Sequence, residues 1–427
     1  MMGDCSERES LVKRPHASED AVDVSVSQRG RRQQVRLVLF ALAAGSLGFV
    51  AGVMWTTSYL IKPVRGACSP PWSPSSTVYG TSAMAAGWSL VAPFGICLRY
   101  DTLFGWLVTS IVMAAGSCGI AGLTVLFCHS MALVGELTYV GTFAFWSLGM
   151  TVGYIVCAEV GVRLLPNKPG IAGGIFPFAT GVGSLVITQI IIALRDAFKE
   201  CDINAGAMFI CIGILIAAVT LPSVPILRCL QQETKTSVDD DSRPENLKWK
   251  NAWMVLKAPR TWFISLFMLC GYTPAFGILM YQEPLVVSLW NTAHPPVSML
   301  AVILMTAYVI GRGLWLVISD KIGLKRSWLL GLIFQGLLLS VLAVLLTLDV
   351  TDSWAQYVSM TVLSVYMVVN PIFKITFYGL CYHLFSSRQR VSAVSVLCAI
   401  SGIAGIAAPL IIDAAYNHFA SQLPRNS

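Results

Sequence analysis

The sequence predicts an all-α polytopic membrane protein, and three observations support this fold class. Hydrophobic residues make up 56% of the 427 residues and charged residues only 12%, and the mean hydropathy of +0.69 exceeds that of water-soluble domains. Apolar segments of about 20 residues, the length that crosses a hydrocarbon core of about 30 Å, recur along the chain. Basic residues gather on one side of these segments, as the positive-inside rule describes for membrane proteins.

The apolar segments predict 11 membrane-spanning helices. They cover residues 36–60, 76–98, 103–127, 132–162, 170–194, 204–228, 260–290, 297–318, 326–348, 353–384 and 391–414. One long hydrophilic segment, residues 229–258, follows the sixth span and is expected to be a flexible cytoplasmic linker. It separates a bundle of six spans, residues 36–228, from a bundle of five spans, residues 259–416.

Both ends of the chain are expected to lie outside the bundles. Residues 1–35 are polar and charged and lack the apolar core of a cleaved signal peptide. We therefore expect a disordered N-terminal tail on the cytoplasmic side. Residues 417–427 are expected to form a short C-terminal tail.

Lysine and arginine are distributed unevenly over the predicted loops, and this asymmetry predicts the orientation in the membrane. One face has the linker cations and Arg29, Arg31, Arg32, Arg36, Arg99, Arg163, Lys168, Lys321, Lys325, Arg326, Arg388 and Arg390. The opposite face has little beyond Lys62, Arg65, Arg195, Lys199 and Arg425. The N-terminus and the linker should therefore be cytoplasmic. The net charge of +7 follows from this topology, so nucleic acid is not an expected partner.

A short motif at the end of the eighth span carries a family resemblance. Gly311 and Arg312 are followed by Asp320, Gly323 and the basic pair Lys325 and Arg326. This arrangement resembles the signature loop of the major facilitator superfamily, in which an Asp, a Gly and a basic cluster join two spans on the cytoplasmic side. The resemblance implies the major facilitator fold, with two six-helix pseudo-repeats.

The first half of the chain contains a second match. It runs from Gly149 through Tyr154 to residues 164–174, and on to Gly181 and Gly183. This stretch looks like the segment that joins spans 4 and 5 in the oxalate/formate antiporter and monocarboxylate transporter families. The resemblance implies a secondary active transporter of a small, monocarboxylate-like organic anion that works by alternating access.

The sequence departs from the family pattern in two places. The first-half loop at residues 93–101 keeps Gly95 and Arg99 but lacks the acid of the signature, so looser gating is expected there. Such transporters usually have twelve spans, whereas this sequence shows 11, so the last span is expected to be missing.

Ionisable side chains within spans are candidate site residues, because inserting a charge into hydrocarbon costs about 2.5–3.5 kcal/mol. Arg312 lies eight residues before Asp320, about 12 Å into the span at about 1.5 Å per residue. Its planar guanidinium can bind a carboxylate bidentately. Its position also matches an Arg on span 8 that the resemblance implicates in binding the substrate carboxylate. Pairing with an acid on a neighbouring helix is the structural alternative.

Three further residues belong to the expected substrate-binding set. Lys374 is a second cation within a span, shortly after Asn370; it would complete an anion site unless its long stem carries the ammonium to the interface. Tyr154 belongs to the first-half match. The span-11 Lys that the resemblance to oxalate carriers implies is absent from residues 391–414, which favours a monocarboxylate.

Gly311, Asp320, Gly323, Lys325 and Arg326 form the expected gating motif. On the cytoplasmic rim, the Asp320 carboxylate can accept hydrogen bonds from a helix N-terminus or pair with a nearby cation. We expect this contact to lock the two halves together in the outward-open state.

The sequence leaves the coupling mechanism open. Glu136, Glu159, Glu283 and Asp413 lie toward the ends of spans, where a solvated interfacial carboxylate is expected. His383 is expected to be interfacial as well. Proton symport and anion exchange therefore both stay as alternatives.

Other function classes are less well supported. The chain has no HExxH, GxSxG or phosphate-binding loop, so we expect neither an enzyme nor a cofactor or metal site. An amino-acid carrier of the same fold and a transport-inactive, sensor-like paralogue are the alternative functions. The expected partners are a small organic anion, protons and the lipid bilayer, around a monomer, with the plasma membrane favoured over an organellar one.

Overall fold

The computed structural model describes residues 19–52, 76–91, 103–127, 132–197, 205–233, 246–280, 297–347, 353–386 and 389–422. Within these ranges the chain is almost entirely helical and contains no strand. The N-terminal half consists of α1 (Glu19–Ala51), α3 (Ser76–Ser89), α5 (Leu103–Leu126), α6 (Ala132–Leu164), α7 (Pro169–Ala197), α8 (Ala205–Thr220) and α9 (Ser223–Glu233). The C-terminal half consists of α10 (Asn246–Lys257), α11 (Pro259–Met280), α13 (Val297–Ile322), α14 (Leu324–Thr347), α15 (Ser353–Val369), α16 (Ile372–Leu384) and α17 (Arg390–Gln422).

The helices confirm the predicted membrane architecture. Over the described residues, nine helical stretches are long and apolar enough to cross a membrane. Two of them, 206–232 and 354–384, each contain two helices, because Pro222 and Pro371 lack the N–H that would continue the preceding helix. α3 and α11 lie where two further spans are predicted, at 76–98 and 260–290.

Large apolar side chains point outward along these helices, as a lipid solvent permits. Val112 on α5, Ile214 on α8 and Leu337 on α14 are each at least 60% exposed. In water such a surface would be an unusual liability. The chain is therefore a multi-pass integral membrane protein.

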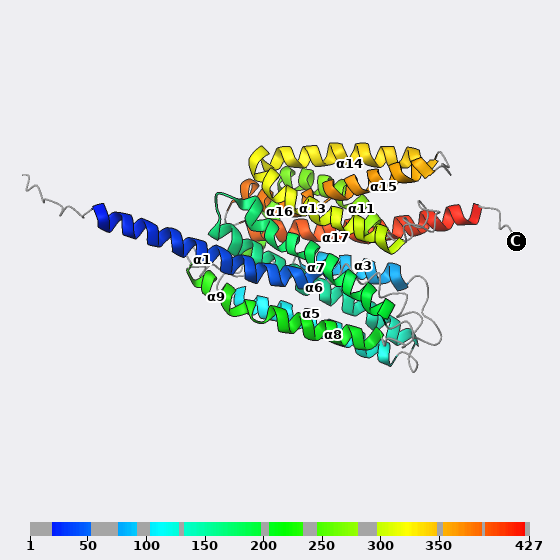
Figure 1. Cartoon of the computed structure of the whole chain (residues 1–427), viewed down its shortest axis with the longest axis horizontal. Coiled ribbons are helices and arrows are strands. Elements are labelled where there is room, and N and C mark those ends of the chain that lie inside the picture. Colours follow the sequence, from blue (N-terminus) through cyan, green and yellow to red (C-terminus); the bar gives the residue numbers. More distant parts are fainter. Residues whose placement is uncertain are drawn as a thin grey trace, which may run out of the picture.

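Three helical segments differ from the sequence expectation. α17 continues to Gln422, into residues 417–427, which were expected to form a short C-terminal tail. α1 begins at Glu19, within the segment expected to be a disordered tail, and it projects well beyond the bundle in Figure 1. α10 forms within the segment expected to be a flexible linker, at Asn246–Lys257. Residues 234–245 of that linker lie outside the described residues.

The two halves lie side by side and meet along a few helices. α5 and α8 form one edge of the molecule and α14 and α15 the opposite edge, with α7, α3 and α17 between them (Figure 1). Across the boundary, α3 packs against α17, and α7 packs against α13 and α16. The candidate site lies at this boundary.

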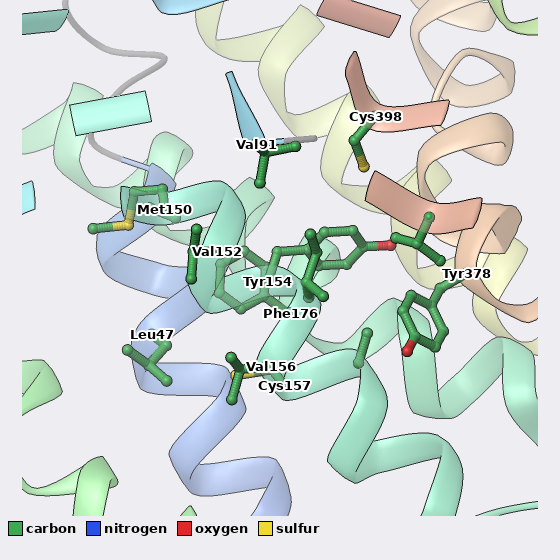
Figure 2. Close-up of a cluster of buried hydrophobic side chains, with 14 of the residues drawn as sticks. Leu47, Val91, Met150, Val152, Tyr154, Val156, Cys157, Phe176, Tyr378 and Cys398 are labelled. Carbon is green, nitrogen blue, oxygen red and sulfur yellow. The ribbon is translucent and has the colours of Figure 1, made fainter. Parts of the chain in front are cut away.

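A buried cluster of side chains joins the halves. Tyr154 and Phe176 of the N-terminal half face Tyr378 and Cys398 of the C-terminal half (Figure 2). The rings of Tyr154 and Phe176 lie 5.5 Å apart, and those of Tyr154 and Tyr378 lie 6.4 Å apart edge to face. Such ring pairs pack favourably beyond the area that they bury, so they fix the spacing of α6, α7 and α16.

Candidate functional site

A small cavity lies where the two halves meet. Its volume is about 60 Å³, which suits a few waters or a ligand of similar size. The cavity is lined by Ala51 of α1, Trp88 of α3, Met150, Thr151 and Tyr154 of α6, Phe176, Pro177 and Thr180 of α7, Met268 and Tyr272 of α11, Lys374 and Phe377 of α16, and Cys398 and Ser401 of α17. Both halves thus contribute to one mostly apolar wall.

Lys374 is the one charged residue among the described residues that line this cavity. Its ammonium lies 4.5 Å from the centre of the Trp88 ring, a cation–π arrangement that joins α16 to α3. It also lies close enough to Arg312 for their charges to interact. The cavity wall therefore contains one basic side chain and no carboxylate among these residues.

Arg312 is fully buried and binds neutral groups. One guanidinium nitrogen donates to the backbone carbonyl of Pro177, on α7 in the other half, and another donates to the hydroxyl of Tyr308 at 2.8 Å. The guanidinium carbon also lies 4.3 Å from the centre of the Tyr308 ring. Over the described residues, the guanidinium has no carboxylate partner, and its Nε has no hydrogen-bond acceptor.

The neighbours of Arg312 explain how a large cation reaches α7. Gly181 lies one turn after Pro177, and a Cβ there would come within 2.9 Å of the Arg312 Cδ. Glycine therefore leaves the space that the Arg312 side chain crosses. Arg312 itself is not part of the cavity wall, whereas Pro177 is. The guanidinium thus lies behind Pro177, which separates it from the cavity.

The other two predicted substrate residues are placed differently. Tyr154 lines the cavity, and its buried hydroxyl has no hydrogen-bond partner among the described residues. Asn370 is buried in the turn between α15 and α16, outside the cavity wall, and its Nδ2 likewise lacks an acceptor there. The structure therefore brings Tyr154 and Lys374 to the cavity and leaves Arg312 and Asn370 behind it.

Asp320, at the end of α13, joins the two halves at the N-terminus of α7. Its Oδ1 accepts a hydrogen bond from the Gly170 N–H at 3.0 Å, and its Oδ2 accepts one from the Ile171 N–H at 3.1 Å. These N–H groups have no partner within their own helix, and the carboxylate lies at the positive end of the helix dipole. A Cβ at Gly170 would overlap Asp320 Oδ1, so glycine is needed for this contact.

The remaining residues of the expected gating motif lie on α13, on α14 and in the turn between them. Gly311 packs against the backbone of Val368 on α15 so closely that a Cβ would overlap it. Gly323 has a φ of +92°, which glycine adopts readily, and it turns the chain from α13 into α14. Lys325 and Arg326 are exposed on the first turn of α14. The glycines are thus structural, and the two cations face away from the protein interior.

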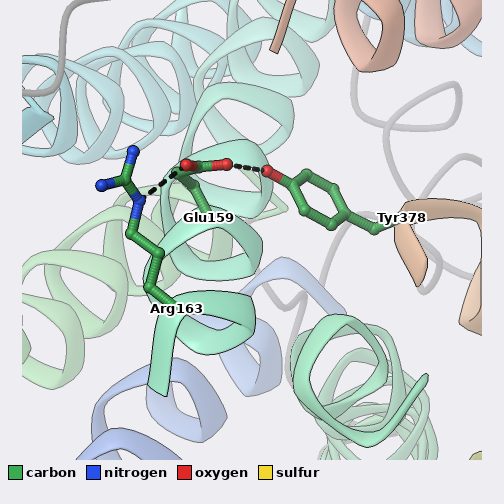
Figure 3. Close-up of polar contacts among 3 residues, drawn as sticks. All are labelled: Glu159, Arg163 and Tyr378. Atoms are coloured by element: carbon green, nitrogen blue, oxygen red, sulfur yellow. Dashed lines mark hydrogen bonds and ion pairs between the residues drawn. The ribbon is translucent and has the colours of Figure 1, made fainter. Parts of the chain in front are cut away.

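A second polar contact between the halves was not predicted from the sequence. The Tyr378 hydroxyl on α16 donates to Glu159 Oε2 on α6, and Arg163 Nε donates to Glu159 Oε1 at 2.8 Å (Figure 3). Glu159 is only 8% exposed. The expectation of a solvated carboxylate does not fit this residue, because Tyr378 and Arg163 replace the water. In the sequence, the available signal for this contact was the spacing of Glu159 and Arg163, which are four residues apart.

Comparisons with known proteins agree with this architecture. Residues 202–409 match the sequence profile of the Major Facilitator Superfamily. No curated protein sequence matches the chain.

Several solved structures have similar folds. The fucose:proton symporter FucP of E. coli is 11% identical, with a TM-score of 0.58 over 90% of this chain and 93% of that one. A bacterial homologue of the iron transporter ferroportin is 13% identical, with a TM-score of 0.62 over 90% and 99%. The proton:xylose symporter XylE is 13% identical, with a TM-score of 0.60 over 90% and 89%. These likenesses show the fold alone.

Proposed function

We propose that this chain, which has the major facilitator fold, is a secondary active transporter of a small, monocarboxylate-like organic anion. The observation that carries the proposal is the state of Arg312: fully buried, bound to neutral groups and directly behind the wall of a cavity that both halves form. The family resemblance of the sequence motifs to oxalate/formate and monocarboxylate carriers supports the same substrate class.

Electrostatics favour an anion in this cavity. The Arg312 guanidinium places positive charge directly behind the wall, and the basic Lys374 side chain lines it. The described residues offer Arg312 no carboxylate partner. A buried charge without an opposite charge costs several kcal/mol, even after the protein relaxes around it. A carboxylate in the cavity would offset part of that cost, and a neutral or cationic solute would not.

The apolar part of the wall favours a small substrate with an apolar end. Met268, Phe377 and Trp88 line the cavity together with the Tyr154 hydroxyl. Pockets of this kind bind mainly by apolar contact and use a few polar groups for orientation. A short-chain monocarboxylate presents one charged end to the cations and one apolar end to these side chains.

The Arg312 contact also suggests how binding is linked to movement. The hydrogen bond from Arg312 to the Pro177 carbonyl joins α13 to α7, one helix from each half. A substrate carboxylate would compete with that carbonyl for the guanidinium, and a charged acceptor forms the stronger bond. Substrate binding would then weaken one contact between the halves, as alternating access requires. Asp320 and the Glu159–Tyr378 pair would form the gate at the N-terminal end of α7.

The experiment that tests the substrate class is counterflow in proteoliposomes. A panel of labelled monocarboxylates, dicarboxylates, neutral amino acids and sugars is measured with and without a pH gradient. We expect saturable exchange of monocarboxylates above all others. A pH gradient that drives net uptake would identify proton symport, and exchange without such drive would identify antiport.

Other outcomes of the panel would point to the alternatives. Preferred exchange of amino acids would indicate an amino-acid carrier, since the carboxylate of an amino acid can bind the same guanidinium. Binding of a solute without flux would indicate a sensor-like protein. Preferred exchange of sugars would contradict the role proposed for Arg312.

A further inference from the structure

A second hollow lies between α1 and α9, away from the cavity between the halves. It measures about 730 Å³. Its walls come from the first turns of the apolar stretch Arg31–Ala51 and from the last turns of the stretch Gly206–Gln232. These two helices are joined below it by a 2.5 Å hydrogen bond between the hydroxyls of Ser46 and Ser223. The hollow is therefore a groove at one end of the two spans, and we call it the α1/α9 groove.

The open end of the α1/α9 groove is strongly basic. Arg31, Arg32 and Arg36 of α1 all line it, and no acidic residue does among the described residues. Arg32 and Arg36 are four residues apart, which places them on the same face of the helix. Arg31 and Arg32 are exposed and Arg36 is half-buried. Three arginines thus line one groove.

The inner part of the groove is apolar. Val35 and Leu39 of α1 and Ile226 and Leu230 of α9 line it. Leu39 lies eight residues after Arg31, about 12 Å further along the helix at about 1.5 Å per residue. The apolar lining on α1 therefore begins among the arginines, at Val35, and continues past them to Leu39, in the direction in which α1 enters the membrane.

We propose that the α1/α9 groove binds an anionic phospholipid, with the phosphate at the three arginines and an acyl chain along Leu39 and Ile226. Basic residues beside a membrane span attract anionic headgroups, by about 1 kcal/mol for each charge near the surface. Membrane orientation alone accounts for positive charge on this face. It does not require that three arginines share one groove with an apolar floor.

The chain itself offers a competing occupant. Three aspartates at positions 239–241 follow α9 in the sequence. They match the charge of the arginines, but they would leave the apolar residues uncovered. A phospholipid matches both parts of the groove, and the lipid bilayer supplies it wherever the protein resides.

Native mass spectrometry of the full chain tests the proposal. The protein is released from nanodiscs that contain equal amounts of phosphatidylserine and phosphatidylcholine, and the retained lipids are counted. We expect phosphatidylserine to be retained at least about tenfold over phosphatidylcholine, from the charge effect at three sites. The variant with Arg31→Gln, Arg32→Gln and Arg36→Gln should lose this preference.

The matched control removes three positive charges from the same membrane face. Arg228, Lys250 and Lys257 lie outside the groove lining, so the variant with Arg228→Gln, Lys250→Gln and Lys257→Gln should keep the preference. An equal loss in both variants would overturn the proposal, because charge alone would explain it. Soluble glycerophosphoserine that competes as well as the lipid would also overturn it, because the apolar floor would then contribute nothing.

Two further measurements keep the proposal testable if the triple variant does not fold. In the wild-type protein, phosphatidylserine with a photoreactive acyl chain should cross-link to peptides that contain Leu39 or Ile226; cross-links confined to other helices would contradict the site. A variant with Asp239→Asn, Asp240→Asn and Asp241→Asn should bind lipid as the wild type does. Retention that appears only in this variant would identify the acidic segment as the native occupant and overturn the proposal.

Discussion

The Tyr378 hydroxyl donates a hydrogen bond to the Glu159 carboxylate, and this contact joins α16 of the C-terminal half to α6 of the N-terminal half. The same carboxylate accepts from Arg163 on its own helix. Glu159 is buried, and its two carboxylate oxygens have one hydrogen-bond partner each, Tyr378 on α16 and Arg163 on α6. Separation of the halves at this point has to break the bond to Tyr378.

The first prediction concerns the strength of the Glu159–Tyr378 contact. Tyr378→Phe removes the donor and leaves the ring in place, so the protein should lose about 1.5–3 kcal/mol, the usual contribution of a hydrogen bond to a charged group. A double-mutant cycle with Glu159→Gln, read from thermal unfolding in one detergent, should give a coupling of at least about 0.5 kcal/mol. Strictly additive effects would show that the contact contributes nothing.

The second prediction concerns Asp320. Asp320→Asn keeps one acceptor oxygen but removes the charge that faces the N-terminus of α7, and it leaves one of the Gly170 and Ile171 N–H groups without its acceptor. We expect the halves to separate more often at this end. In a background with Ser319→Cys, a position that is fully buried, the rate of maleimide labelling should rise several-fold.

A control for that measurement is available on the next helix. Lys325 is exposed, so Lys325→Gln should leave the labelling rate of the cysteine at 319 within about twofold of its parent. Labelling that is unchanged in Asp320→Asn would show that the contact with α7 does not hold this end closed.

The third prediction concerns Gly170. A Cβ at this position would overlap the Asp320 carboxylate, so Gly170→Ala should displace Asp320 and raise the same labelling rate. Gly116, on α5, is the matched control because a Cβ there meets nothing within 4 Å. Gly116→Ala should be neutral or stabilising, since alanine favours the helix by about 1 kcal/mol over glycine. Equal behaviour of the two variants would contradict the close contact at Gly170.

The fourth prediction concerns Lys374 in the cavity. Lys374→Met keeps most of the length of the side chain and removes its amino group, so the KM for the proposed monocarboxylate should rise by roughly tenfold while the protein remains at least as stable. Ser401→Ala, another substitution in the cavity wall, should change the KM little. An unchanged KM in Lys374→Met would show that the ammonium does not contact the substrate.

The membrane architecture was predictable because lipid imposes one strong requirement. Every span must be a helix of about 20 apolar residues, so hydropathy locates α5, α7 and α14 directly. A hydropathy pattern gives no information on helices that lie outside the apolar core of the membrane. The part of α1 before residue 31 is too polar to be recognised in this way, and α10, with 12 residues, is too short.

The candidate site was predictable only in part. Arg312 could be recognised because a charge inside a span is costly and rare. Its partner, the Pro177 carbonyl, depends on the packing of α13 against α7 across 135 residues of sequence. Glu159 was predicted to lie solvated at the membrane–water interface, because its partner Tyr378 is 219 residues away in the sequence. Pairings of this range come from tertiary packing, which a single sequence does not specify.

The most direct test of the central claim is monocarboxylate counterflow by Arg312→Lys. Lysine keeps the charge but loses the planar fork that can bind a carboxylate bidentately. We predict that counterflow falls at least about tenfold, the equivalent of one charge-assisted hydrogen bond. Arg390→Lys is the matched control, because the Arg390 guanidinium also lies over a tyrosine ring, that of Tyr382, and lies outside the cavity wall. It should keep nearly all of the flux. Counterflow that is intact in Arg312→Lys would contradict the anion-carrier account.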